Sequence, residues 1–181
     1  TRPWDDFRVG HIPGSLSFPL IKSFSTDIGS MVRETDEVVL VVAENALDST
    51  TRAMIRIGLD RIVGWCPPED LAAAGVAGAT IEEIEAGSAQ DFIASRSPVL
   101  LDVRRMSEFE KGHIPGATNI SHTRLADRIG EVPDGEPVLI NCRSGVRSAR
   151  AAAYLKGLGR ETVNLKGGFM AWDGQGLPTE G

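Results

Sequence analysis

The segment 142–147 holds the residues of this chain that are best suited to covalent chemistry, beginning with Cys142 and ending with Arg147. It follows the apolar run 138–140, which is too short for a helix and suits a buried strand. A strong helix-forming stretch, 148–156, comes directly after it. The cysteine is therefore predicted in a tight loop between a strand and a helix, where open α/β sheets bind their ligands.

That loop should bind anions and activate the thiol. Backbone N–H groups at a helix N-terminus form an anion-binding concavity, because the helix dipole leaves partial positive charge there. The two arginines of the loop add full charges, and its glycine allows the turn. A thiol in that field favours its thiolate form, so Cys142 is the predicted catalytic residue. The predicted substrate-binding residues are Arg143, Ser144, Gly145, Val146 and Arg147. The alternative is an ordinary packed cysteine beside surface arginines.

The chain contains two copies of one unit. Residues 7–14 and 109–116 are identical at six of eight positions, at an offset of 109 − 7 = 102. Residues 39–42 match 138–141 at an offset of 138 − 39 = 99. A period near 100 residues predicts a duplicated domain, because solenoid repeats are much shorter.

Both copies alternate short strands and helices, which predicts an α/β fold of two tandem domains, each with a mainly parallel sheet flanked by helices. In the second copy, residues 99–101 suit a buried strand that Asp102 ends, and Ser88 to Asp91 resembles a capping box that opens a helix. The predicted domains are residues 1–66 and 79–181. A linker is predicted at 67–78, where two prolines should end regular structure.

The first copy has lost the reactive residues. Ala43 stands at the position of Cys142, and the corresponding loop, 43–48, ends on Asp48 in place of an arginine. We expect an inactive domain that packs on the second copy or docks a further domain, with regulatory binding as the alternative. No counterpart of strand 99–101 precedes Thr1, so this domain is predicted to be N-terminally incomplete and the sequence to be the C-terminal part of a longer protein.

The other cysteine and the three histidines offer no comparable site. Cys66 lies far from the loop, so we expect a packed or linker thiol, no disulfide framework and a reducing, cytoplasmic setting. His11 and His113 recur in both copies, including the one without a nucleophile, which favours a structural role; His122 stands alone. No metal-ligand spacing is present, and we predict neither a metal nor another cofactor.

Composition excludes several classes of partner. The 19 Lys and Arg and 25 Asp and Glu give a net charge of −6, and no basic run is present. Nucleic acid and membrane surfaces are therefore excluded as main partners. The hydrophobic fraction of 41% is that of a globular chain, and no apolar stretch approaches the ~18 residues of a membrane span.

The second copy resembles the rhodanese (sulfurtransferase) family. The matching features are Asp102, Val103 and Arg104, the segments 112–117 and 142–147, Gly167 and Gly168, Trp172, and the segment 176–178. The resemblance implies that Cys142 takes the sulfane sulfur of thiosulfate or of a persulfide such as glutathione persulfide and passes it to a thiophilic acceptor. It also implies that Arg147 pairs with an anionic donor, with Arg143 as a second candidate. Asp102, Arg104 and Ser148 are supporting residues, the first two as a structural ion pair.

Two such domains in a row resemble the C-terminal pair of fusions in which a metallo-β-lactamase-fold persulfide dioxygenase precedes two rhodanese domains. That resemblance implies an upstream metallo-β-lactamase-fold domain in the same polypeptide, with small-molecule sulfur donors and acceptors as the other partners.

Two alternatives to a sulfurtransferase stay open. Cysteine phosphatases of the same fold place five residues between cysteine and arginine and tend to have a histidine before the nucleophile. Here four residues separate Cys142 from Arg147, and Asn141 precedes them. The other alternative is a non-catalytic rhodanese-like interaction module, which a sulfur-transfer assay would distinguish.

Overall fold

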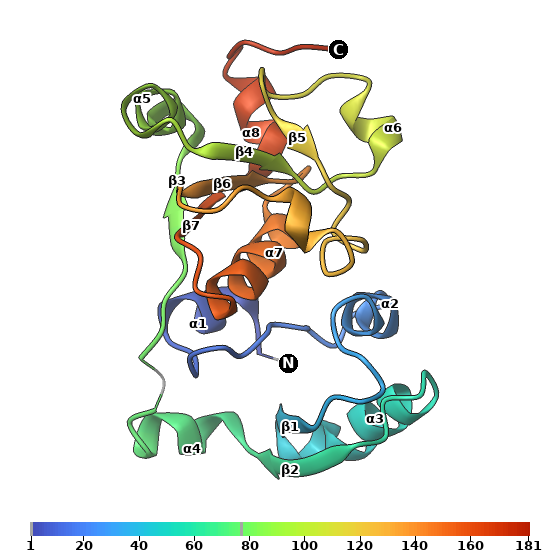
Figure 1. The fold of residues 1–181 in the computed structure, drawn as a ribbon. Helices are drawn as coiled ribbons and strands as arrows, with labels where there is room; N and C mark the ends of the chain where they lie inside the picture. Colours follow the sequence, from blue (N-terminus) through green and yellow to red (C-terminus); the bar gives the residue numbers. More distant parts are fainter. Residues whose placement is uncertain (1, 77) are drawn as a thin grey trace. The chain divides into compact units, whose positions relative to one another are not determined.

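The structure is a computed structural model that describes residues 2–76 and 78–181, so Thr1 and Ala77 of the predicted linker lie outside the described residues. The chain divides into two units (Figure 1). Unit 1 comprises the chain up to Pro13 and Ser17–Thr80, and unit 2 comprises Gly14–Leu16 and Ile81–Gly181.

Unit 2 is built on a five-stranded parallel sheet in the order β3-β7-β6-β4-β5. The strands are β3 (Glu82–Ile84), β4 (Val99–Asp102), β5 (Thr118–Asn119), β6 (Val138–Asn141) and β7 (Thr162–Leu165). The helices are α5 (Ala86–Arg96), α6 (Met106–Phe109), α7 (Val146–Gly157) and α8 (Gly168–Gly174), with a 3-10 turn η1 (Ile129–Glu131). The predicted α/β class, parallel sheet and flanking helices are confirmed for this unit.

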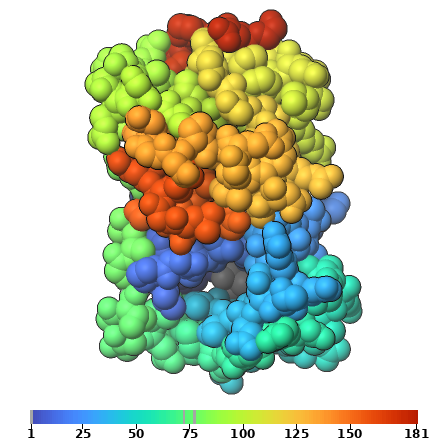
Figure 2. All heavy atoms as spheres, in the orientation of Figure 1, coloured from blue at the N-terminus to red at the C-terminus, as the bar shows by residue number. Residues whose placement is uncertain are grey.

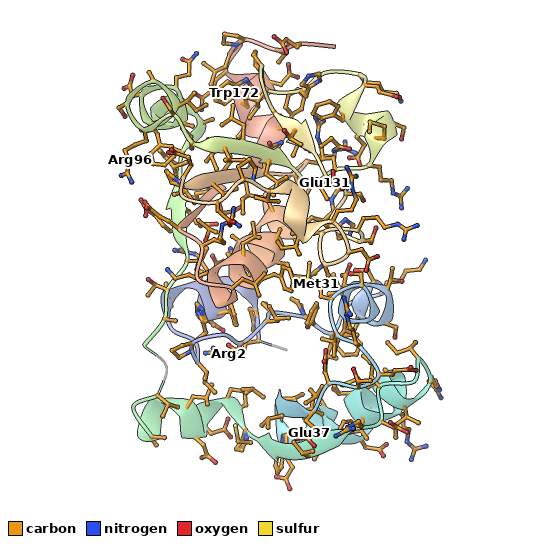
Figure 3. All side chains as sticks on the ribbon, viewed as in Figure 1. Arg2, Met31, Glu37, Arg96, Glu131 and Trp172 are labelled. Atoms are coloured by element: carbon orange, nitrogen blue, oxygen red, sulfur yellow. The ribbon has the colours of Figure 1, made fainter. Side chains whose placement is uncertain are left out.

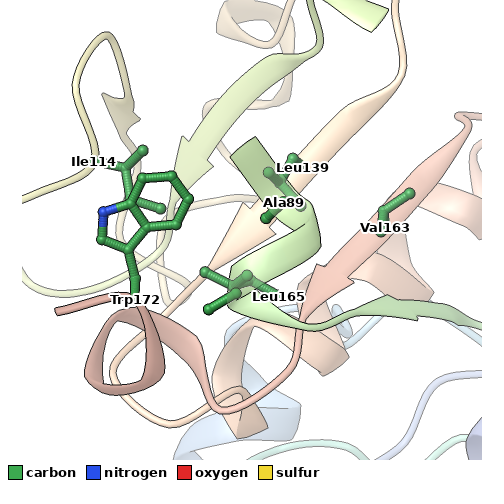
Figure 4. Close-up of a cluster of buried hydrophobic side chains, with 7 residues drawn as sticks. Ala89, Ile114, Leu139, Val163, Leu165 and Trp172 are labelled. Carbon is green, nitrogen blue, oxygen red and sulfur yellow. The ribbon is translucent and has the colours of Figure 1, made fainter. Parts of the chain in front are cut away.

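Helices cover both faces of this sheet, whose central strands are buried on both sides. Every residue of β6 and β7 is buried. Leu139, Val163 and Leu165 pack with Ala89 of α5 and Trp172 of α8 on one face, as Figure 4 shows. On the other face, Thr162 Oγ1 donates to a backbone carbonyl of α7. The sheet therefore lies between two layers, with α5 and α8 on one face and α7 on the other.

Two surface ion pairs join neighbouring segments of unit 2. Arg96, labelled on α5 in Figure 3, pairs with Glu161 at 2.9 Å, and Lys166 pairs with Glu85 at 2.6 Å. These side chains are exposed, so each pair contributes little to stability. On the face seen in Figure 2, the yellow and orange parts of unit 2 form one continuous packed surface.

Unit 1 contains a two-stranded parallel sheet of β1 (Val38–Val41) and β2 (Ile62–Cys66). Its helices are α1 (Trp4–Val9), α2 (Phe24–Gly29), α3 (Glu44–Ile55) and α4 (Pro68–Ala73). No helix in the described part of the chain is long and apolar enough to cross a bilayer.

Three local predictions were wrong. The segment 67–78 contains α4 and belongs to unit 1, because Pro68 stands at the first position of the helix, where its missing N–H costs nothing. The segment 43–48 is no loop, since α3 begins at Glu44. Finally, α5 begins two residues before Ser88, because the buried side chains of Ala86 and Ala89 place its first turn in the core.

Candidate active site

The cysteine loop is a sharp turn from β6 into α7. Cys142 directly follows the strand, and α7 begins at Val146. Gly145 turns the chain with φ +91°, a conformation that side chains rarely adopt. A Cβ added there would lie 3.2 Å from the backbone nitrogen of Gly167 and 3.4 Å from the carbonyl oxygen of Leu165. Glycine is therefore required both for the turn and for its close packing.

The N-terminus of α8 holds the loop in place. Phe169 N–H donates to the carbonyl of Cys142 at 2.7 Å, and Met170 N–H donates to that of Arg143 at 2.9 Å. This approach depends on Gly168, whose φ is +61° and whose added Cβ would lie only 2.4 Å from the Cys142 carbonyl oxygen. The backbone of the cysteine is thus fixed by a second loop at the same end of the sheet.

Three donors converge on the carbonyl of Gly145. They are the backbone N–H of Ala149 at 3.0 Å, the hydroxyl of Ser148 at 3.1 Å and the side-chain amide of Asn164 at 3.3 Å. The Ser148 hydroxyl also lies 3.4 Å from Cys142 Sγ, so its single proton can be donated to the carbonyl or to the sulfur. The contact of Asn164 on β7 with the loop was not predicted from the sequence. Its one signal was an asparagine between the apolar residues Val163 and Leu165.

The sulfur lies beneath the surface of the loop. Cys142 is a free cysteine with 0% of its surface exposed, whereas Arg143 and Ser144 beside it are exposed. Val146 and Met170 also expose large apolar side chains. A donor therefore reaches the sulfur only if some of the atoms that cover it move.

Arg147 is paired with an acid that the sequence analysis did not identify. Its two terminal nitrogens donate to the two carboxylate oxygens of Glu108 at 2.8 and 2.9 Å, a bidentate geometry. The arginine hydrogen bond lowers the pKa of Glu108 from 4.5 to about 2. The same hydrogen bond raises the pKa of Arg147, and the nearby sulfur of Cys142 adds to this effect. No signal near Glu108 in the sequence points to Arg147, which lies 39 positions later.

Asp102 and Arg104 form a buried frame beside the loop. Their side chains are 0% and 5% exposed and approach to 2.7 Å. Asn141, the residue before the cysteine, donates to Asp102 at 3.0 Å. The guanidinium of Arg104 lies 4.1 Å from the ring centre of Phe169, the residue whose N–H bonds the cysteine carbonyl. The pair thus contacts two residues that adjoin the cysteine backbone, Asn141 before it and Phe169 on α8.

The two repeated histidines have the same arrangement in each unit. His113 stacks on Phe109 with ring centres 3.7 Å apart, and its Nδ1 lies 3.0 Å from the Phe109 carbonyl oxygen. His11 stacks on Phe7 at 4.1 Å, with its Nδ1 at 2.9 Å from the Phe7 carbonyl oxygen. In the described parts of the chain, no group of three or more His, Cys, Asp or Glu side chains could hold a metal ion.

This fold and loop define a recognisable class of domain. Residues 85–175 match the rhodanese-like domain, and the chain belongs to that family. A sulfurtransferase of Allochromatium vinosum is 41% identical over 101 residues, which are 54% of this chain and 94% of that protein. The thiosulfate sulfurtransferase GlpE of Shewanella oneidensis is 38% identical over 79 residues, 43% of this chain and 78% of that protein.

The solved structures agree with this assignment. A rhodanese-related protein from Thermoplasma volcanium superposes with a TM-score of 0.52 at 28% identity, covering 55% of this chain and 97% of that one. A rhodanese-like domain protein from Staphylococcus aureus gives a TM-score of 0.50 at 31% identity, covering 56% and 100%.

Proposed function

We propose that the protein is a sulfurtransferase that carries sulfane sulfur on Cys142. The observation that carries this proposal is the position of its Sγ, at the carboxyl end of a buried strand, 3.4 Å from the Ser148 hydroxyl and beside the N-terminus of α7. Helix N-termini stabilise anionic sulfur. The relatives named as sulfurtransferases give independent support.

The reaction is a double displacement. The Cys142 thiolate attacks the outer sulfur of thiosulfate, the S–S bond of the donor breaks, and sulfite leaves with the electron pair. With a low-molecular-weight persulfide such as glutathione persulfide, the leaving group is the thiolate. An acceptor nucleophile, such as sulfite, cyanide or a thiol, then attacks the terminal sulfur of the enzyme persulfide and regenerates the thiolate. No oxidant or cofactor is consumed.

The loop residues divide the task. The backbone amides of residues 143–147 stabilise the persulfide anion, with Ser144, Gly145 and Val146 as members of this cradle. Arg147 and Arg143 attract an anionic donor. Two of the five N–H groups of an arginine are used by Arg147 for Glu108, which leaves three for the substrate or the loop. Asp102, Arg104 and Ser148 support the loop.

The proposal is tested by mass spectrometry of the full chain after exposure to thiosulfate or glutathione persulfide. We expect a mass increase of one sulfur on Cys142, and transfer of that sulfur to cyanide. Cys142→Ser should abolish both, while the matched variant Cys66→Ser should leave both nearly unchanged. Transfer that survives Cys142→Ser contradicts the mechanism, and a stable chain that never gains sulfur would make this a non-catalytic rhodanese-like module.

Part of the proposal concerns the first copy, which we take as a degenerate rhodanese-like domain in tandem with the catalytic one. The matching histidine stacks and the shared parallel pairing of β1 with β2 and β6 with β7 support this. An upstream metallo-β-lactamase-fold domain and a cytoplasmic location belong to the same proposal, on the resemblance given above.

The first copy should be unable to transfer sulfur. At the positions of Cys142 and the two loop arginines it has Ala43, Glu44 and Asp48, so a cysteine installed there would face two carboxylates. Ala43→Cys in a Cys142→Ser background should therefore stay inactive. Measurable turnover by this double variant would show that the first copy keeps a competent site.

A further inference from the structure

Glu108 is an acid that pairs with a residue of the cysteine loop, although it lies on another element. It belongs to α6 and reaches Arg147, 39 positions later, through both carboxylate oxygens. The side chains of this pair are 30% and 23% exposed, in contrast to the fully enclosed pair of Asp102 and Arg104. The contact between Glu108 and Arg147 thus lies at the solvent side of the loop, where a donor arrives.

The charges around the loop divide into compensated and uncompensated ones. Arg104 is matched by Asp102, and Arg147 is matched by Glu108. Arg143, which follows the cysteine in the chain, is exposed. Because the carboxylate of Glu108 offsets the charge of Arg147, the attraction that the loop exerts on an anionic donor is weaker than its two arginines alone would give.

We infer that Glu108 is a specificity-determining residue, which disfavours dianionic sulfur donors relative to donors of lower charge. This inference rests on the proposed sulfur transfer through Cys142. A carboxylate repels each unit of donor charge, so its removal should benefit a dianion more than a monoanion of the same shape. The residue acts on the charge of the donor and takes no part in breaking its S–S bond.

Two donors of nearly equal size isolate this effect. Thiosulfate is a dianion, and methanethiosulfonate, in which a methyl group replaces one oxygen, is a monoanion. Both offer a terminal sulfane sulfur to the thiolate. The first releases sulfite and the second releases methanesulfinate, and both leave the same persulfide on Cys142. The change of their kcat/KM ratio between a variant and the wild type therefore reports the charge preference, because the difference between the two leaving groups cancels in that comparison.

Three variants of the full chain form the test. Glu108→Gln removes the charge and keeps an oxygen that can accept from Arg147. Glu108→Asp keeps the charge on a shorter side chain. Glu110→Gln removes the same formal charge from an exposed acid two residues further along. At a separation of ~7 Å between the donor and the carboxylate, one unit of donor charge changes kcat/KM by about threefold at the dielectric of bulk water. At the dielectric of a protein surface the change is about fiftyfold.

We expect Glu108→Gln to raise the thiosulfate-to-methanethiosulfonate ratio by about three- to fiftyfold, and Glu108→Asp and Glu110→Gln to change it by less than about twofold. The kcat/KM of Glu108→Gln with thiosulfate should also fall more steeply with ionic strength than that of the wild type, because the site has gained net positive charge. If the ion pair only holds α6 against α7, Glu108→Gln should change neither the ratio nor the dependence of kcat/KM on ionic strength.

The inference is overturned if Glu108→Gln leaves the ratio within about twofold, if Glu110→Gln shifts it equally, or if Glu108→Gln loses activity with both donors while remaining folded. These outcomes are distinct from failure of the proposed function. If the proposed function fails, neither donor loads sulfur onto Cys142 of the wild-type chain, and mass spectrometry of the same samples shows this.

Discussion

Replacing Gly168 by alanine tests whether the turn before α8 holds the cysteine loop. The added methyl carbon would lie 2.4 Å from the carbonyl oxygen of Cys142, 2.7 Å from the nitrogen of Gly145 and 2.8 Å from the carbonyl carbon of Arg143. All three contacts are with backbone, so no flexible side chain can move away. The φ of +61° adds a conformational cost that glycine does not have.

The expected loss of stability follows from these two terms. A non-glycine residue in the left-handed region costs about 1–2 kcal/mol. Inserting a methyl group into a well-packed site costs about 1–3 kcal/mol, because the surrounding backbone must shift. Gly168→Ala should therefore lower the free energy of unfolding by about 2–5 kcal/mol. It should also displace the Cys142 carbonyl from its 2.7 Å hydrogen bond with Phe169 N–H and so slow persulfide formation.

Urea unfolding can be followed in unit 2 alone by the fluorescence of Trp172 in a Trp4→Phe, Trp65→Phe background. Gly174→Ala is the matched control, since Gly174 ends the same helix and an added Cβ meets no atom within 4 Å. The control should change the free energy of unfolding by less than about 1 kcal/mol. If Gly168→Ala is as stable as Gly174→Ala and gains sulfur at the wild-type rate, the turn does not position the cysteine.

Three further predictions concern charge and access. Arg104→Met should cost about 3–5 kcal/mol, because it leaves the Asp102 carboxylate buried without its ion-pair partner, and adding Asp102→Asn should recover part of that loss in urea unfolding. The pKa of Glu108, about 2 in the folded chain against an ordinary 4.5, means that its ion pair contributes fully above pH 4.5 and is lost as the pH falls towards 2. Because the side chain is 30% exposed, urea titrations should show the wild type losing only about 1 kcal/mol more than Glu108→Gln over that range, and equal losses would contradict the ion pair. A bulky maleimide should label the half-buried Cys66 of the native chain faster than the fully buried Cys142, and the reverse order by peptide mass spectrometry would show that the loop is open.

Local sequence patterns were sufficient to predict the backbone around the cysteine. A short apolar run that ends at a helix-forming stretch produced β6, the turn and α7, because neighbouring residues determine each of these elements. The apolar run that ends at Asp102 likewise produced β4, which lies beside β6 in the sheet and brings Asp102 opposite Asn141. Because parallel strands end at the same side of a sheet, the polar residues at the ends of β4 and β6 could be predicted to lie close together.

Contacts between distant segments were not predictable in the same way. Glu108 meets Arg147 only because α6 and α7 converge, and nothing within four residues of Glu108 in the sequence specifies that partner. The start of α5 was misplaced for a similar reason, since burial of Ala86 outweighs the capping preference of Ser88. Local preferences of about 1 kcal/mol are readily overridden by packing in the core.

Unit 1 forms a helix at the positions that the sequence repeat aligns with the cysteine loop. At the offset of 99, Ala46 stands where Gly145 makes its left-handed turn, and α3 runs through this position from Glu44. The same offset places Glu69 of α4 opposite Gly168, so unit 1 lacks at that position the glycine that lets α8 approach the cysteine backbone. A missing nucleophile alone would leave an intact anion site. Here the turn glycine and the packing glycine are absent together at the aligned positions, so the left-handed turn that separates Cys142 from α7 does not form in unit 1, whichever side chain occupies position 43.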